Sequence, residues 1–118
     1  DVCSSDLGIM TKAVESKAYL DACYLKRAVM DFIELDNSPE VPNTVEYAIV
    51  AGQNACGDDA LNYYQAFFTK ITGKKVNIFF LNPKRKRSSA RAIYNDKARQ
   101  DFTLDLPTYN EFTNFLLK

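Results

Sequence analysis

Residues 14–32 read VESKAYLDACYLKRAVMDF, and within this stretch the residue pattern changes from that of a strand to that of a helix. The segment 9–17, IMTKAVESK, is typical of a strand that becomes polar toward its end. Asp21 can then cap a helix. Apolar residues follow at the spacing i, i+3, i+4, i+7, which places them on one helix face: Leu25, Ala28, Val29 and Phe32.

Strand and helix signals continue to alternate after this helix. An Asn-Ser-Pro sequence at 37–39 ends the helix, and the segment 45–51, VEYAIVA, fits a buried strand. We expect a loop over 52–57 and then a second helix, which Asp58 or Asp59 caps and which ends near Gly73. Its apolar stripe is expected to contain Leu61, Tyr64, Phe68 and Ile71.

The last third of the chain adds a strand, a basic loop and a helix. The segment 76–81, VNIFFL, predicts a strand, which Asn82-Pro83 ends. A capping box at 108–111 predicts a final helix with Phe112, Phe115 and Leu116 inward. The β-α-β-α-β order predicts an α/β fold, with a mixed sheet flanked by helices and a C-terminal helix.

Composition restricts the class of protein. The chain has 118 residues, of which 47% are hydrophobic, so it can bury a core within one domain. No apolar run reaches the roughly 20 residues that a membrane span needs. Histidine is absent and the cysteines show no CxxC spacing, which argues against a zinc site or a His-dependent triad and favours a reducing, intracellular setting.

The net charge is formally zero, but the charges are unevenly distributed. Residues 70–99 hold ten Lys and Arg against one acid, whereas residues 8–69 hold four bases and nine acids. A polyanion is the partner that such a basic segment favours. Its densest part could contact DNA phosphates through Lys84, Arg85, Lys86, Arg87 and Arg91. A solvated loop and a nuclear-localisation signal are the alternatives.

The first seven residues, DVCSSDL, have no apolar period of either kind, so we expect no regular element there. Their back-translation resembles the end of a common sequencing adapter. We therefore expect residues 1–7 to be a non-native leader, and residues 8–118 to form a single partial domain that has lost an N-terminal portion. A natural disordered N-terminus is the alternative.

Glu15 and Lys17 form the combination with the clearest chemical use. Strand side chains alternate between faces, so these two should project together, about 7 Å apart along the backbone, while Ser16 points away. A carboxylate can hold a divalent cation, and an ammonium can orient water and stabilise charge on a phosphate. Together they could hydrolyse a phosphodiester without histidine.

The stretch VESKAYLDACYLKRAVMDF resembles the second half of the PD-(D/E)xK nuclease signature, and it is most similar to type II restriction endonucleases. Those enzymes often have an E-x-K strand followed by an aromatic residue, an aliphatic residue and an aspartate, as in Tyr19-Leu20-Asp21 here. The later segments EYAIVAG and YYQAFFTKITGKKVNIFFLNP fit the strand-helix-strand that completes the family's core. The likeness covers roughly residues 9–83.

This resemblance implies a restriction-endonuclease-like core that uses Mg²⁺ and acts on double-stranded DNA. Glu15 would be a metal ligand, Lys17 the catalytic lysine, and the Ser16 backbone carbonyl a further metal ligand. The resemblance also implies a homodimer of the full-length protein, in the cytoplasm of a prokaryote.

One element of the family pattern is not evident. The pattern requires an aspartate, often after proline, on the strand before E-x-K, and the only upstream acids are Asp1 and Asp6. Ser5 stands where proline is expected, and Leu7-Gly8 leaves little room for a strand pair. We expect the native aspartate to be missing and this fragment to be inactive as it stands.

The leading hypothesis is therefore the core of a Mg²⁺-dependent DNA endonuclease. The alternative is a non-catalytic nucleic-acid-binding or protein-interaction domain that uses residues 84–91 and leaves Glu15 and Lys17 as a surface ion pair. Such a pair contributes about 0–1 kcal/mol. The geometry of Glu15 and Lys17 separates the two hypotheses, because side chains that point apart would exclude a shared reaction centre.

Overall fold

The computed structural model describes residues 2–4, 10–82 and 104–118. In chain order its elements are β1 (Val2–Ser4), β2 (Met10–Leu20), α1 (Ala22–Asp36), β3 (Glu46–Asn54), α2 (Asp58–Thr72), β4 (Val76–Phe80) and α4 (Leu106–Leu117).

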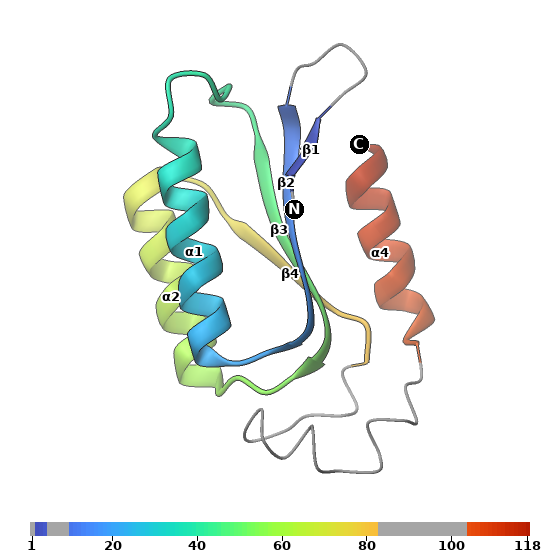
Figure 1. Ribbon diagram of the computed structural model, residues 1–118. Coiled ribbons are helices and arrows are strands. Elements are labelled where there is room, and N and C mark those ends of the chain that lie inside the picture. Colours follow the sequence, from blue (N-terminus) through green and yellow to red (C-terminus); the bar gives the residue numbers. More distant parts are fainter. Residues whose placement is uncertain (1, 5–9, 83–103) are drawn as a thin grey trace.

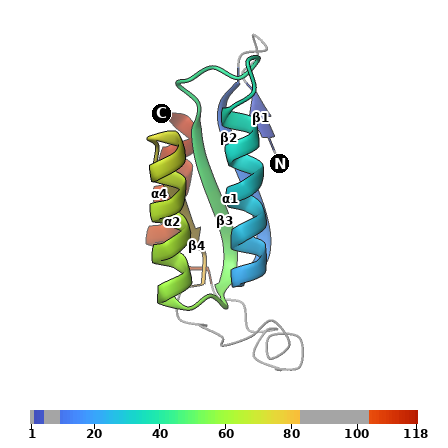
Figure 2. The ribbon, with the colours of Figure 1, turned by 90° about the vertical axis from the view of Figure 1, so that its left-hand side faces the viewer.

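The strands form one mixed sheet in the order β1-β2-β3-β4 (Figure 1). β2, β3 and β4 are parallel, and β1 is antiparallel to β2. α1 and α2 cover one face of the sheet and α4 covers the other, as Figures 1 and 2 show. The predicted α/β class, with a mixed sheet flanked by helices, is confirmed.

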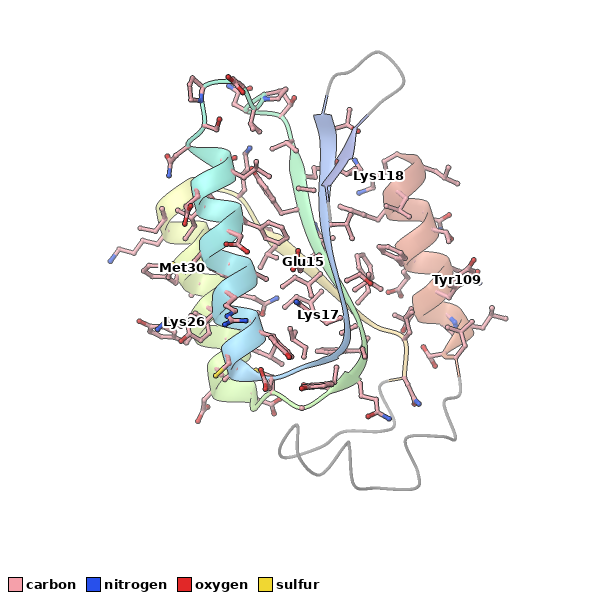
Figure 3. All side chains as sticks on the ribbon, viewed as in Figure 1. Glu15, Lys17, Lys26, Met30, Tyr109 and Lys118 are labelled. Carbon is pink, nitrogen blue, oxygen red and sulfur yellow. The ribbon has the colours of Figure 1, made fainter. Side chains whose placement is uncertain are left out.

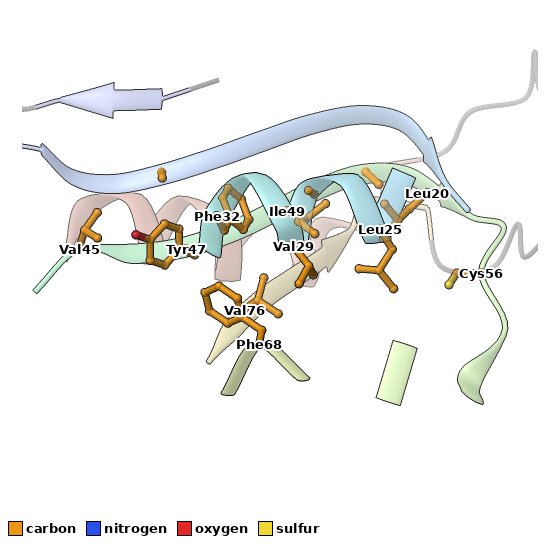
Figure 4. Close-up of a cluster of buried hydrophobic side chains, with 13 residues drawn as sticks. Leu20, Leu25, Val29, Phe32, Val45, Tyr47, Ile49, Cys56, Phe68 and Val76 are labelled. Atoms are coloured by element: carbon orange, nitrogen blue, oxygen red, sulfur yellow. The ribbon is translucent and has the colours of Figure 1, made fainter. Parts of the chain in front are cut away.

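The larger part of the core lies between the sheet and the α1–α2 layer (Figure 4). The predicted inward residues of α1 are all buried: Leu25, Ala28, Val29 and Phe32. Tyr47 of β3 lies between Phe32 and Phe68, with ring centroids 4.9 Å and 5.4 Å away. This aromatic group holds both helices against the centre of the sheet.

On the opposite face, α4 packs through Phe112 and Phe115. Phe79 lies 5.3 Å and 5.7 Å from these rings, measured between centroids. Phe115 also joins Val14, Ala48 and Val50 in a second buried cluster. The prediction that Leu116 points inward is wrong, because this side chain is 38% exposed.

The ends of the strands differ from the prediction. β2 continues to Leu20 and β3 to Asn54, because Tyr19 pairs with Gln53 and Leu20 with Asn54. The expected loop over 52–57 is therefore wrong for its first half. Gln53 is only 3% exposed, although its side chain is polar.

The helix caps are confirmed in part. Asp21 caps α1 by accepting a hydrogen bond from the Tyr24 backbone N–H at 2.8 Å, and Gly73 ends α2 with a positive φ of 74°. The N-cap of α2, however, is Gly57, and Asp58 and Asp59 lie in the first turn, where their charges favour the helix dipole.

Two further predictions for the helices are wrong. The expected capping box at 108–111 does not form, because Asp105 caps α4 by accepting from the Thr108 N–H. Ile71 is 49% exposed. Ten residues of helix separate it from Leu61, so it lies about 80° away around the axis.

The N-terminal segment contains a short strand that the sequence did not predict. Val2 pairs with Ala13, Cys3 with Lys12 and Ser4 with Met10. The expectations of no regular element in residues 1–7, and of no room for a strand pair, are therefore wrong. Asp1 and Asp6 lie outside the described residues.

Candidate functional site

Strand β2 places Glu15 and Lys17 on the same face of the sheet. In the parallel register Glu15 pairs with Ile49 and Lys17 with Ala51, and both β3 residues belong to the core under α1 and α2. Figure 3 shows the two polar side chains between β2 and α1. The structure thus brings them together, as strand alternation predicts.

The charged atoms of this pair are near each other but not in tight contact. Lys17 Nζ lies 3.5 Å from Glu15 Oε1, and the side chains are 30% and 27% exposed. Water can therefore reach both groups, and the pair contributes only about 0–1 kcal/mol to folding. Stabilisation of the fold therefore does little to explain why Glu15 and Lys17 lie together.

Tyr24 holds the lysine from the side of α1. Lys17 Nζ lies 4.8 Å from the centroid of the Tyr24 ring, within the range of a cation–π contact. The Asp21 cap fixes the backbone of Tyr24. The Tyr19 ring packs against the Tyr24 ring, with 5.3 Å between the ring centroids. Tyr24 was not among the residues that the sequence suggested for the site, because its contact depends on how α1 folds back over β2.

Among the described residues, β2 has a strand neighbour on one side only where the pair lies. β1 pairs with β2 only at Met10, Lys12 and Ala13, so within the described residues the stretch 15–17 has β3 as its paired neighbour on one side. Ser16 lies between the two charged residues and its side chain is exposed. A substrate could approach this part of the strand from its outer edge.

Glu15 is the carboxylate that this site offers to a metal ion. The described residues contain no group of three or more His, Cys, Asp or Glu side chains that could hold one. Mg²⁺ often uses only one or two carboxylates and keeps several waters, with substrate phosphate completing its shell. The Glu15 oxygens and a backbone carbonyl at Ser16 fit such a partly hydrated ion in donor type.

The predicted DNA contacts cannot be placed. Lys84, Arg85, Lys86, Arg87 and Arg91 all lie outside the described residues. Among the helices that are described, none is long and apolar enough to cross a membrane.

Two other lysines make closer ion pairs. Lys12 Nζ donates to Glu46 Oε1 at 2.7 Å and lies 5.0 Å from the centroid of the Phe115 ring. Lys74 Nζ donates to Asp36 Oδ1 at 2.6 Å. The first pair joins β2 to β3, and the second joins the end of α1 to the segment between α2 and β4. Both pairs therefore hold parts of the fold together.

Asp36 also accepts a hydrogen bond from the Tyr47 hydroxyl at 2.9 Å. Burial raises the pKa of the Tyr47 phenol well above its ordinary value, and the hydrogen bond and negative charge of Asp36 raise it further. Tyr47 therefore remains protonated well into the alkaline range and serves as a donor in the core.

Comparisons of the chain with protein-family models, with curated proteins and with solved structures give no match.

Proposed function

We propose that this chain is the catalytic core of a DNA endonuclease of the restriction-enzyme type, which hydrolyses phosphodiester bonds with Mg²⁺. The observation that carries the proposal is the placement of Glu15 and Lys17 side by side on this stretch of β2. The α/β fold around them is compatible with the restriction-endonuclease-like core that the sequence resemblance implies.

Each residue of the site has a distinct role in this proposal. Glu15 and the Ser16 carbonyl would hold Mg²⁺, which when bound supplies a Lewis acid for the phosphate and acidifies water. The Lys17 ammonium orients the attacking water and stabilises the negative charge that builds on the phosphate. Tyr24 is a positioning residue, since its ring keeps the ammonium near Glu15.

The partners follow from the same proposal. The substrate is double-stranded DNA, whose phosphates the basic residues 84–91 would contact. A homodimer would provide two active sites, one for each strand. The proposed enzyme acts in the cytoplasm of a prokaryote.

Cleavage of supercoiled plasmid in the presence of Mg²⁺ tests this function. The assay compares the unsubstituted chain, Lys17→Met and, as a matched control, Lys26→Met, which alters an exposed lysine of α1. The same set is assayed in the complete open reading frame that encodes residues 8–118, because the family pattern expects an aspartate on the strand before E-x-K.

In the complete open reading frame, we expect Lys17→Met to lower the cleavage rate by about 100-fold or more, as for loss of one charge-stabilising group. Lys26→Met should cleave like the unsubstituted chain. Equal cleavage by all three in the complete open reading frame, or no cleavage by that frame without a substitution, would contradict the proposal.

A non-catalytic nucleic-acid-binding domain is the second candidate. It is favoured by the finding that the described residues contain no group of three metal-binding side chains. Such a domain would bind DNA through residues 84–91 with an affinity that falls steeply with salt, and Lys17→Met would leave that binding unchanged.

A further inference from the structure

Among the described strands, β4 is the last of the sheet. β3 is its paired neighbour, and within the described residues no strand pairs with its other side. A groove of about 440 Å³ runs along this side. It is lined by β4 together with Gln65 of α2, Lys75, and Thr108 and Glu111 of α4.

The sequence of this strand lacks the usual protection of a sheet edge. Exposed edges commonly carry a charge, a proline or a bulge that prevents pairing with another strand. β4 reads VNIFF and has none of these. Val76 is buried, but the other four residues are only partly buried, so apolar surface lies beside an edge that has no strand partner among the described residues.

The strand is complementary to itself in the antiparallel direction. A two-fold axis at Ile78 places Val76 opposite Phe80 of a second copy, and Ile78 opposite its own equivalent. Pairs of aromatic and β-branched side chains across neighbouring strands are among the favourable ones. A two-fold interface is also closed, so it produces a dimer and not a fibre.

The charges of the groove complement each other under the same symmetry. Asp105 N–H donates to Leu81 O at 2.6 Å, so α4 begins beside the end of β4. Antiparallel pairing brings Lys75, at the start of β4, to the groove of the other copy, which Glu111 of α4 lines. The two-fold axis makes this Lys75–Glu111 pair twice, and the net charge of zero opposes association little.

We propose that a second copy of this chain pairs with the outer edge of β4 in antiparallel orientation. The resulting sheet has the order β1-β2-β3-β4-β4-β3-β2-β1 across the dimer. This edge of β4 would be the interface of the homodimer in the proposed function, but the evidence for it comes from β4 and its groove alone. It does not require that Glu15 and Lys17 carry out any reaction.

Sedimentation equilibrium of the whole chain tests this interface. The series contains the unsubstituted chain, Lys75→Glu, Glu111→Lys, the double charge swap, and Lys26→Glu as a control outside the groove. Each single reversal places like charges opposite each other and should weaken the dimer by about tenfold. The double swap restores opposite charges, so its dimer dissociation constant should return toward that of the unsubstituted chain.

Restoration by the double swap cannot arise from unfolding, because a variant that fails to fold would not regain the dimer. A chain that stays monomeric at all concentrations, or a dimer that neither single reversal weakens, would overturn the proposal. Lys17→Met should dimerise normally even if it loses cleavage, so this interface and the proposed chemistry can fail separately.

Discussion

Two lysines of β2, Lys12 and Lys17, form ion pairs that differ in their burial and in the distance between the charged atoms. Lys12 reaches across to Glu46 of β3 at 2.7 Å, and its side chain is only 7% exposed beneath α4. Glu15 and Lys17 lie on the same strand 3.5 Å apart, with more than a quarter of each side chain exposed. The first pair joins two strands, whereas the second joins no separate elements.

This difference indicates which pair is available for chemistry. A charge that is buried and already hydrogen-bonded stabilises the fold and has little freedom to act on a substrate. A loosely paired, partly exposed ammonium can exchange its carboxylate for a phosphate oxygen. Tyr24 adds to this difference, because it orients the Lys17 ammonium and leaves it reachable by water.

The largest expected effect on stability is that of Lys12→Met. This change removes the hydrogen-bonded ion pair with Glu46 and the contact with the Phe115 ring, while a side chain of similar length remains. We expect a loss of about 1–3 kcal/mol in the free energy of unfolding. Urea denaturation measures it, with Lys26→Met as the control. A loss no larger than that of the control would mean that Lys12 is not a structural residue.

Asp36 forms a close ion pair with Lys74 and also accepts a hydrogen bond from the Tyr47 hydroxyl. We expect the stabilisation that the Tyr47 hydroxyl provides to depend on pH. An unfolded tyrosine loses its proton at about pH 10. Because the pKa of Tyr47 is raised in the folded state, the unfolded chain binds fewer protons above that pH, and stability falls as pH rises. Tyr47→Phe should cost about 1 kcal/mol at neutral pH, and the difference from the unsubstituted chain should shrink above about pH 10.

Urea denaturation at a series of pH values follows this change. Tyr63→Phe is the control, because the Tyr63 side chain is 62% exposed. A constant difference for Tyr47→Phe across the alkaline range would show that its hydroxyl is not held as a donor to Asp36.

The smallest expected effect on stability is that of Glu15→Gln. The ion pair with Lys17 is partly hydrated and lies within one strand, so its loss should change the free energy of unfolding by less than about 0.5 kcal/mol. The same urea titrations measure it. A loss comparable to that of Lys12→Met would show that Glu15 is a structural residue.

The sequence predicted those features that are determined locally. The Asp21 cap and the four buried residues of α1 follow from a period within one segment, and both are confirmed. The same strand alternation placed Glu15 and Lys17 on one face. The α/β order likewise follows from the sequence of strand and helix signals along the chain.

The features that the sequence did not predict depend on distant partners. Gln53 belongs to β3 because Tyr19 pairs with it, and Lys12 is buried because Glu46 and Phe115 meet it from other elements. Asp105 caps α4, although the sequence at 108–111 also matches the pattern of a capping box. β1 has no pattern of its own and forms by pairing with β2.

The most direct test measures plasmid cleavage and stability side by side for Lys17→Met and Lys12→Met, in the complete open reading frame that encodes residues 8–118. We predict opposite outcomes: Lys17→Met loses Mg²⁺-dependent cleavage but keeps its stability, whereas Lys12→Met loses stability and, below its unfolding transition, still cleaves. If Lys17→Met cleaves as well as Lys12→Met, then Lys17 is not part of a reaction centre and the central claim is wrong.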